Sequence, residues 1–152
     1  MRIEKLTVQQ LPLLTELFDY NDAGQMIAEC TRDIQSGAVD IFVLFDGQRP
    51  VGELHIRYES DDDRYARRGL RAYLFAFRIR EEQQGRGYGT HLLKTVLAEL
   101  TREGYREFTV GVEDDNARAL HMYQTMGFSE LVLRAREEYQ GDAYEYNLYL
   151  KR

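Results

Sequence analysis

Three glycines within five residues form the feature of this sequence that most restricts its fold. The segment Gln83–Thr90 reads Gln-Gln-Gly-Arg-Gly-Tyr-Gly-Thr. An extended apolar run, Ala72–Ile79, comes before it, and apolar residues recur at helical spacing after it, from Leu92 to Leu100. The order strand, glycine loop, helix brings backbone N–H groups and the positive end of a helix dipole to one place. Such a loop predicts an anion-binding site, best suited to a phosphate or a pyrophosphate.

Two common phosphate-binding motifs do not match this loop. A P-loop needs Gly-Lys-Ser or Gly-Lys-Thr at the start of the helix, which the sequence lacks there. The dinucleotide fingerprint GxGxxG, counted from Gly85, would place its third glycine where Thr90 stands. The loop instead matches Gln-x-x-Gly-x-Gly, with Gln84 as the glutamine and Gly87 and Gly89 as the two glycines. The alternative interpretation is a tight turn that uses glycine only for its dihedral freedom.

Composition limits the class of protein and its partners. A chain of 152 residues predicts one domain, residues 1–152, with a sizeable core. The net charge of −6 argues against nucleic acid as the main partner. The lone cysteine, Cys30, excludes an intrachain disulfide and is typical of a reducing compartment. No apolar run approaches the roughly 20 residues of a membrane span, and Met1–Lys5 shows no signal-peptide pattern. We therefore expect a cytoplasmic protein without a membrane partner.

Hydrophobic periodicity and turn residues predict an α/β (α+β) fold with about six to seven strands and about four helices. A capping box at Thr7 and Gln10 begins a first helix whose apolar stripe ends at Phe18. The other helices are predicted from Asp22 to Gly37, from the glycine loop to Gly104, and from Asp115 or Asn116 to Gly127. The expected strands cover residues 2–6, 41–45, 51–58, 72–80, 108–112, 128–134 and 144–150. The strand–helix–strand unit around the loop predicts one parallel pair.

A second pattern follows the strand after that helix. From Asn116 to Phe128 the chain reads Asn-x-x-Ala-x-x-x-Tyr-x-x-x-Gly-Phe. Asn116 lies at a helix start, Ala119 and Tyr123 share one helical face, and Gly127 ends the helix. Alone, this pattern is better explained by a capped amphipathic helix with a tyrosine in the core.

The two patterns in this order resemble the GNAT superfamily of acyl-CoA-dependent N-acetyltransferases. The motifs cover the region from Leu70 to Phe128, and the rest of the chain matches in element order only. The resemblance implies a strongly twisted mixed sheet in one domain. It also implies that the protein is an acyltransferase with acetyl-CoA as co-substrate. Acetyl-CoA would enter a wedge between the strands that end near Ile79 and Val112, and the amine would attack directly in a ternary complex.

The resemblance also assigns roles to individual residues. The pyrophosphate would lie on N–H groups from Gly85 to Thr90, and the N–H of Ile79 would polarise the thioester carbonyl. Asn116 would touch the pantetheine or adenosine side. Tyr123 would lie beside the sulfur as a hydrogen-bond donor or acid. The expected cofactor-binding residues are Phe77, Arg78, Ile79, Gln84, Gly85, Arg86, Gly87, Tyr88, Gly89, Thr90, Asn116 and Tyr123.

The general base is where the sequence departs from the family. A lysine-like amine is neutral in roughly one molecule in a few thousand at pH 7, so a base is useful. Two positions that often hold glutamate in relatives are Tyr73 and Gly111 here. Glu53 and His55, on one face of a predicted strand, are the remaining candidates, with Glu113 as a weaker one. The expected catalytic residues are Tyr123, Glu53 and His55. Exposed polar side chains without a catalytic role, or water as the proton acceptor, are the alternatives.

The acceptor is expected to be a small primary amine such as a polyamine, an amino sugar or an amino acid. A protein N-terminus or a lysine is the alternative acceptor. A non-catalytic acyl-CoA sensor is a second alternative, motivated by the missing glutamates, and another nucleotide-binding enzyme is a third. Three scattered histidines and one cysteine offer no plausible metal site. A homodimer is common among similar proteins and is a further open expectation.

Overall fold

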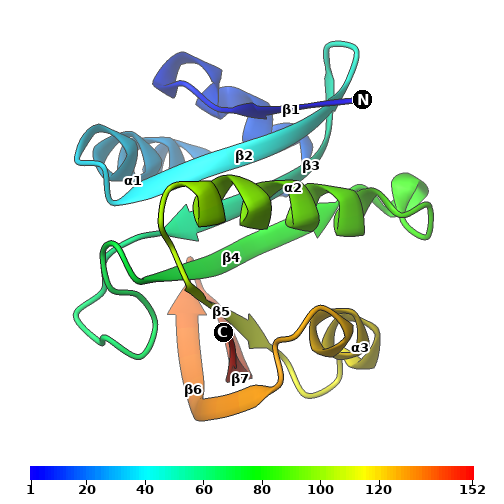
Figure 1. The fold of residues 1–152 in the computed structure, drawn as a ribbon. Helices are drawn as coiled ribbons and strands as arrows, with labels where there is room; N and C mark the ends of the chain where they lie inside the picture. The colour runs from blue at the N-terminus through cyan, green and yellow to red at the C-terminus, as the bar shows by residue number, and fades with distance from the viewer.

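The computed structural model describes residues 1–152, and its seven strands form one mixed sheet in the order β1-β2-β3-β4-β5-β7-β6 (Figure 1). The strands are β1 (Arg2–Lys5), β2 (Val39–Asp46), β3 (Arg49–Arg57), β4 (Arg71–Ile79), β5 (Glu107–Val112), β6 (Glu130–Tyr139) and β7 (Asp142–Lys151). The helices are η1 (Val8–Glu16), α1 (Ala23–Gln35), η2 (Glu81–Gln83), α2 (Tyr88–Arg102) and α3 (Ala117–Thr125), where η marks a 3₁₀ helix. The predicted fold class is confirmed.

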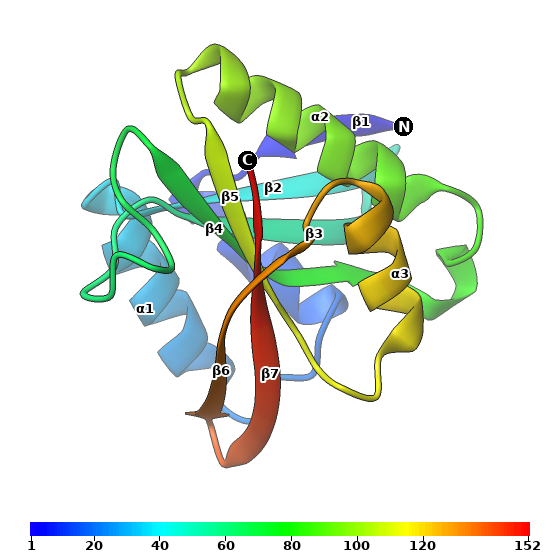
Figure 2. The ribbon, with the colours of Figure 1, turned by 60° about the horizontal axis from the view of Figure 1, so that its bottom comes forward.

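Helices cover both faces of the sheet, because the side chains of each strand alternate between two cores. On β2, Ile41 and Val43 pack with η1 and α1 in one core. Phe42 and Leu44 point the other way, into a larger core that includes α2 and the buried Tyr123 of α3. Figure 2 shows α1 and α2 on opposite sides of the strands. A site between strands of this sheet can therefore be reached from two sides.

The helix ends follow the local signals in the sequence. Asp22 caps α1 by accepting a hydrogen bond from the N–H of Gln25 at 2.9 Å. Asn116 caps α3 in the same way, with the N–H of Ala119 at 3.1 Å. Gly104 follows α2 with φ of +105°, a left-handed conformation that suits glycine. The predictions for these three helices are confirmed.

The first helix differs from its prediction. It is a 3₁₀ helix that ends at Glu16, with Pro12 inside it. Pro12 lacks the N–H that a regular α-helix would use, which favours the tighter and shorter form. The predicted capping box is present, and Gln10 accepts a hydrogen bond from the N–H of Thr7 at 2.9 Å. Phe18 therefore does not join a helical stripe: it lies beyond the helix, 37% exposed.

The sheet splits between its two parallel strands, β4 and β5. Their pairing begins at Arg71 and stops at Leu74, opposite Val110. A bulge in β4 coincides with the split: two residues of β4, Ala76 and Phe77, stand opposite one residue of β3, and Ala76 has φ of +47°. A bulge bends and twists its strand, so the rest of β4 turns away from β5. The backbone edge of β4 after Leu74 faces this gap.

Candidate active site

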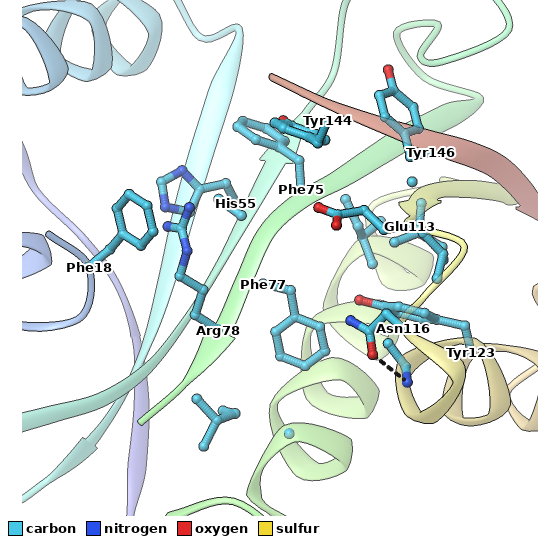
Figure 3. Close-up of a pocket in the computed structure, with 18 of the residues that line it drawn as sticks. Phe18, His55, Phe75, Phe77, Arg78, Glu113, Asn116, Tyr123, Tyr144 and Tyr146 are labelled. Carbon is cyan, nitrogen blue, oxygen red and sulfur yellow. Dashed lines mark hydrogen bonds between the residues drawn. The ribbon is translucent and has the colours of Figure 1, made fainter. Parts of the chain in front are cut away.

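A cavity of about 1240 Å³ occupies the split and is lined from both faces of the sheet. One half is formed by the glycine loop and the start of α3. The other half is formed by α1, the segment before it and the β6–β7 hairpin. Both halves meet at the open edge of β4, from Phe75 to Ile79 (Figure 3). The cavity can thus accept one molecule from each side and bring them together between the strands.

The glycine loop has the geometry of an anion site. Gly85 and Gly87 have φ of +78° and +83°, which only glycine adopts without strain. The N–H groups of residues 85–90 donate to no protein acceptor, and three of them begin α2, whose dipole is positive at that end. A Cβ on Gly89 would lie 3.5 Å from Ile79 and 3.6 Å from Phe77. The bare helix start is therefore held against the end of β4, and its residues fit a diphosphate.

Two loop residues predicted to bind the cofactor have side chains engaged elsewhere. Gln84 donates from its amide to the carbonyl of Ile79 at 3.0 Å and so ties the loop to β4. Arg86 turns toward Gln83, at 3.4 Å, and does not line the cavity. Arg118, in the first turn of α3, lies beside Gly85 instead: its guanidinium is 3.6 Å from where a Cβ on that glycine would be. The sequence analysis missed Arg118, although it stands two residues after Asn116.

The open edge of β4 presents a backbone donor. The N–H of Arg80 bonds the carbonyl of Val51 on β3 at 2.9 Å. Because successive residues of a strand point their N–H groups to opposite edges, the N–H of Ile79 points into the gap. The side chain of Arg78 lies on the α1 face, where its guanidinium covers the ring of Phe18 at 4.0 Å. A backbone donor thus lies where the two halves of the cavity meet.

Tyr123 places a phenol at the same junction. Its side chain is packed between Phe77 and Phe128, with ring centroids 6.3 and 5.6 Å away, and the residue is 5% exposed. The hydroxyl makes no hydrogen bond to the protein and points into the cavity (Figure 3). Burial raises the pKa of Tyr123 well above its usual value. The side chain therefore remains a neutral hydrogen-bond donor at physiological pH.

Glu53 and His55 form a buried pair on the α1 face of β3. Glu53 is 0% exposed and His55 is 4% exposed, so neither is the exposed polar residue of the alternative interpretation. The Nε2 of His55 lies 2.6 Å from one carboxylate oxygen of Glu53, and a guanidinium nitrogen of Arg78 lies 3.4 Å from the same oxygen. If Glu53 is a carboxylate, which only accepts, Nε2 would carry the proton and Nδ1 would be the proton acceptor. His55 lines the cavity and Glu53 lies behind it.

The structure explains why the two family glutamate positions are occupied by other residues. A Cβ on Gly111 would lie 2.8 Å from the ring of Tyr146, so any larger side chain there would displace that ring. Tyr73 stacks on Phe75 with centroids 5.5 Å apart. It also contacts Tyr65 edge to face at 5.1 Å. Aromatic packing has thus replaced carboxylates on this wall.

The half of the cavity next to α1 is aromatic and acidic. Figure 3 shows the carboxylate of Glu113 pointing toward the centre of the cavity. The hydroxyl of Tyr144 donates to Glu137 at 2.9 Å, and burial is the main cause that raises the pKa of this tyrosine. Carboxylates and aromatic faces both attract ammonium groups. Lining residues in this half to which the sequence analysis gave no role include Phe18, Tyr20, Asn21, Glu29, Asp33, Arg57, Phe75, Glu137, Tyr139, Gln140, Asp142 and Tyr144.

This combination of a split sheet, a glycine loop and a buried phenol fits the class of acyltransferases. The family model described as "Acetyltransferase (GNAT) family" matches residues 8–128. The chain therefore belongs to the GNAT family of acetyltransferases, which use acetyl-CoA, and the resemblance noted in the sequence is confirmed. No helix is long and apolar enough to cross a lipid bilayer.

Known proteins similar to this chain are named as acetyltransferases. N-alpha-acetyltransferase 30 of Schizosaccharomyces pombe is 29% identical over 109 residues, which cover 71% of this chain and 70% of that protein. The structure of a ribosomal-protein-alanine N-acetyltransferase from Brucella melitensis superposes with a TM-score of 0.76 at 17% identity, covering 99% of both chains. A protein from Salmonella typhimurium solved with its cofactor acetyl-CoA gives a TM-score of 0.72 at 17% identity, covering 99% of this chain and 92% of the other. Both structures support the fold.

Proposed function

We propose that this protein transfers the acetyl group of acetyl-CoA to the primary amine of a small molecule, by direct attack in a ternary complex. The observation that carries the proposal is the shared cavity. Free N–H groups of the glycine loop, the open edge of β4 and the hydroxyl of Tyr123 all line it, while a separate acidic and aromatic half remains for an amine. We include in the proposal that residues 1–152 act as one acetyltransferase domain in the cytoplasm. A homodimer is compatible with it.

Residues of the loop and of β4 would hold acetyl-CoA, which supplies the acetyl group as a thioester. The N–H groups from Gly85 to Thr90 suit its diphosphate, with Arg118 adding a positive charge. The open edge at Phe77 and Ile79 suits an amide-containing arm, because its backbone groups lack a strand partner on that side. Asn116, at the start of α3, contributes its amide NH₂ group, since its oxygen already caps the helix.

The protons of the reaction have defined places to go. His55 would take the proton that the amine loses, at Nδ1, while Glu53 holds the ring through Nε2. The N–H of Ile79 would stabilise the negative charge that develops on the carbonyl oxygen. Tyr123 would donate a hydrogen bond to the departing thiolate. Its raised pKa disfavours complete proton transfer to a thiolate, because an ordinary thiol has a pKa of about 8.5, so stabilisation is its expected role.

A protein N-terminus is the second candidate acceptor, and the names of similar proteins favour it. The Schizosaccharomyces pombe relative is called an N-alpha-acetyltransferase, and the Brucella melitensis protein is called a ribosomal-protein-alanine N-acetyltransferase. The matched residues cover about 70% or more of each chain, which supports the same use of the fold here. Against it stands the acidic, aromatic lining of the acceptor half, which suits a compact cation.

A thiol-release assay with acetyl-CoA and a panel of amines tests the proposal. The panel holds a linear diamine, an amino sugar, a free amino acid, a lysine-containing peptide and a peptide with a free N-terminus, and mass spectrometry confirms each product. We expect turnover with a small amine at a higher kcat/KM than with either peptide. A preference for the N-terminal peptide would support the second candidate. Tight acetyl-CoA binding without turnover of any amine would instead identify an acyl-CoA sensor.

A further inference from the structure

The turn of the β6–β7 hairpin has an unusual residue at its first central position. Tyr139 pairs with Asp142, so Gln140 and Gly141 form a two-residue turn, and both have positive φ, +49° and +88°. Such a turn favours asparagine or glycine at its first position, because their side chains tolerate left-handed backbone. Glutamine tolerates this left-handed conformation less well than asparagine or glycine does. A residue held in a sparsely populated backbone conformation often marks a functional feature.

The side chain of Gln140 provides such a feature, because it fastens the hairpin to the start of α1. Its amide oxygen accepts from the N–H of Asp22 at 2.9 Å, and its NH₂ group donates to the carbonyl of the same residue at 2.8 Å. The side chain of Asn21 donates to the carbonyl of Gln140. We call these three hydrogen bonds the Gln140 clasp. They join residues 118 or 119 positions apart in the sequence, as two strands of a sheet would be joined.

The clasp closes a ring of chain around the acceptor half of the cavity. Asn21, Tyr139 and Gln140 all line this half. Beside the clasp, the hydroxyl of Tyr139 donates to Glu29 of α1 at 3.4 Å, which adds a second bridge between hairpin and helix. Figure 2 shows the hairpin reaching past the sheet toward the segment that leads into α1. The acceptor half is therefore bounded by β4, by α1, by the hairpin and by the bridge between the last two.

From this geometry we propose that Gln140 determines acceptor specificity: its clasp limits the width of the acceptor entrance and selects slender, unbranched primary amines over bulky ones. The inference rests on the proposed function, since the entrance must lead to an amine site. It adds a specific residue and a specific class of substrate. An asparagine at the same position would keep the turn but would be one methylene too short for both bonds to Asp22. The choice of glutamine is thus explained by its reach.

The test compares acceptor binding in three variants of the full-length protein loaded with CoA. Gln140→Gly removes the amide and relaxes the turn, and Gln140→Asn keeps the turn and shortens the amide. Glu138→Ala is the matched control, because this exposed residue of the same hairpin pairs only with Arg136 and does not line the cavity. Calorimetry measures the Kd of a linear diamine and of a peptide with a bulky first residue. Hydrogen exchange follows the N–H of Asp22.

The expected result is a change in discrimination. The Kd of the peptide divided by the Kd of the diamine should fall by about tenfold in both Gln140 variants, since steric selection is of that order. Glu138→Ala should keep the wild-type ratio. The N–H of Asp22 should exchange faster in both Gln140 variants. An unchanged ratio, or unchanged exchange at Asp22, would overturn the inference. Because the readout is binding, the two proposals can be tested separately. A shifted ratio without turnover would support the role of Gln140 in acceptor specificity and reject the proposed acetyltransferase function. Turnover with a constant ratio would do the reverse.

Discussion

Replacing Tyr123 with phenylalanine removes a single oxygen atom from the junction of the cavity. A hydrogen bond to a charged partner contributes about 1.5–3 kcal/mol, so its loss should reduce kcat by about 10- to 150-fold. The KM for acetyl-CoA should change by less than about twofold, because the bond forms mainly with the departing thiolate. The hydroxyl bonds nothing in the protein, so the free energy of unfolding should stay within about 0.5 kcal/mol.

The assay is thiol release at saturating amine, with thermal unfolding measured in parallel. Tyr105→Phe is the matched control: Tyr105 is also a buried tyrosine, 6% exposed, but it packs against Tyr58 with centroids 5.4 Å apart and does not line the cavity. Because the pKa of Tyr123 is raised, its phenol keeps its proton and should cause no loss of wild-type activity below pH 10. A wild-type rate in Tyr123→Phe, or an equal loss in Tyr105→Phe, would refute the assignment.

Three further variants or reactions test other parts of the structure. Gly87→Val places a branched side chain at φ of +83° and should weaken acetyl-CoA binding more than tenfold in calorimetry, whereas Gly47→Val, at φ of +61° in the β2–β3 hairpin, should leave that affinity intact. Gly111→Ala brings a Cβ to 2.8 Å from the ring of Tyr146 and should destabilise the protein by about 1–3 kcal/mol in denaturant unfolding; an unchanged midpoint would contradict this packing. Burial raises the pKa of Cys30 from 9.0 to about 11. At pH 9 its thiolate is then about fiftyfold scarcer than that of an unburied cysteine, so its alkylation should be at least about fiftyfold slower in the folded protein than in the unfolded chain. A folded-state rate equal to the unfolded one would show that the thiol is not protected.

Local signals in the sequence predicted the parts of the fold that local chemistry determines. Asp22 and Asn116 cap helices because their short side chains reach the nearby N–H groups. The glycine loop was recognised because its dihedrals and its helix start are properties of adjacent residues. Helix η1 was predicted too long, since the spacing of Phe18 looked helical while Pro12 favoured a tighter turn.

Contacts between distant segments lay beyond the reach of the sequence. Nothing near Glu53 or His55 in the sequence shows that α1 covers this face of the sheet, so the burial of the pair could not be predicted. The Gln140 clasp depends on a partner about 118 positions away, and the glycine at position 111 depends on the ring of Tyr146.

The short pairing between β4 and β5 has a consequence for how the protein unfolds. Four residue pairs are all that join the half-sheet of β1 to β4 with the half-sheet of β5 to β7 along their shared border. A molecule that makes hydrogen bonds to the open edge of β4 and also contacts α3 would link these two half-sheets, as an added strand would. Substrate binding should then raise the melting temperature and make the unfolding transition more cooperative. Backbone amides of both β4 and β5 should become protected from hydrogen exchange together.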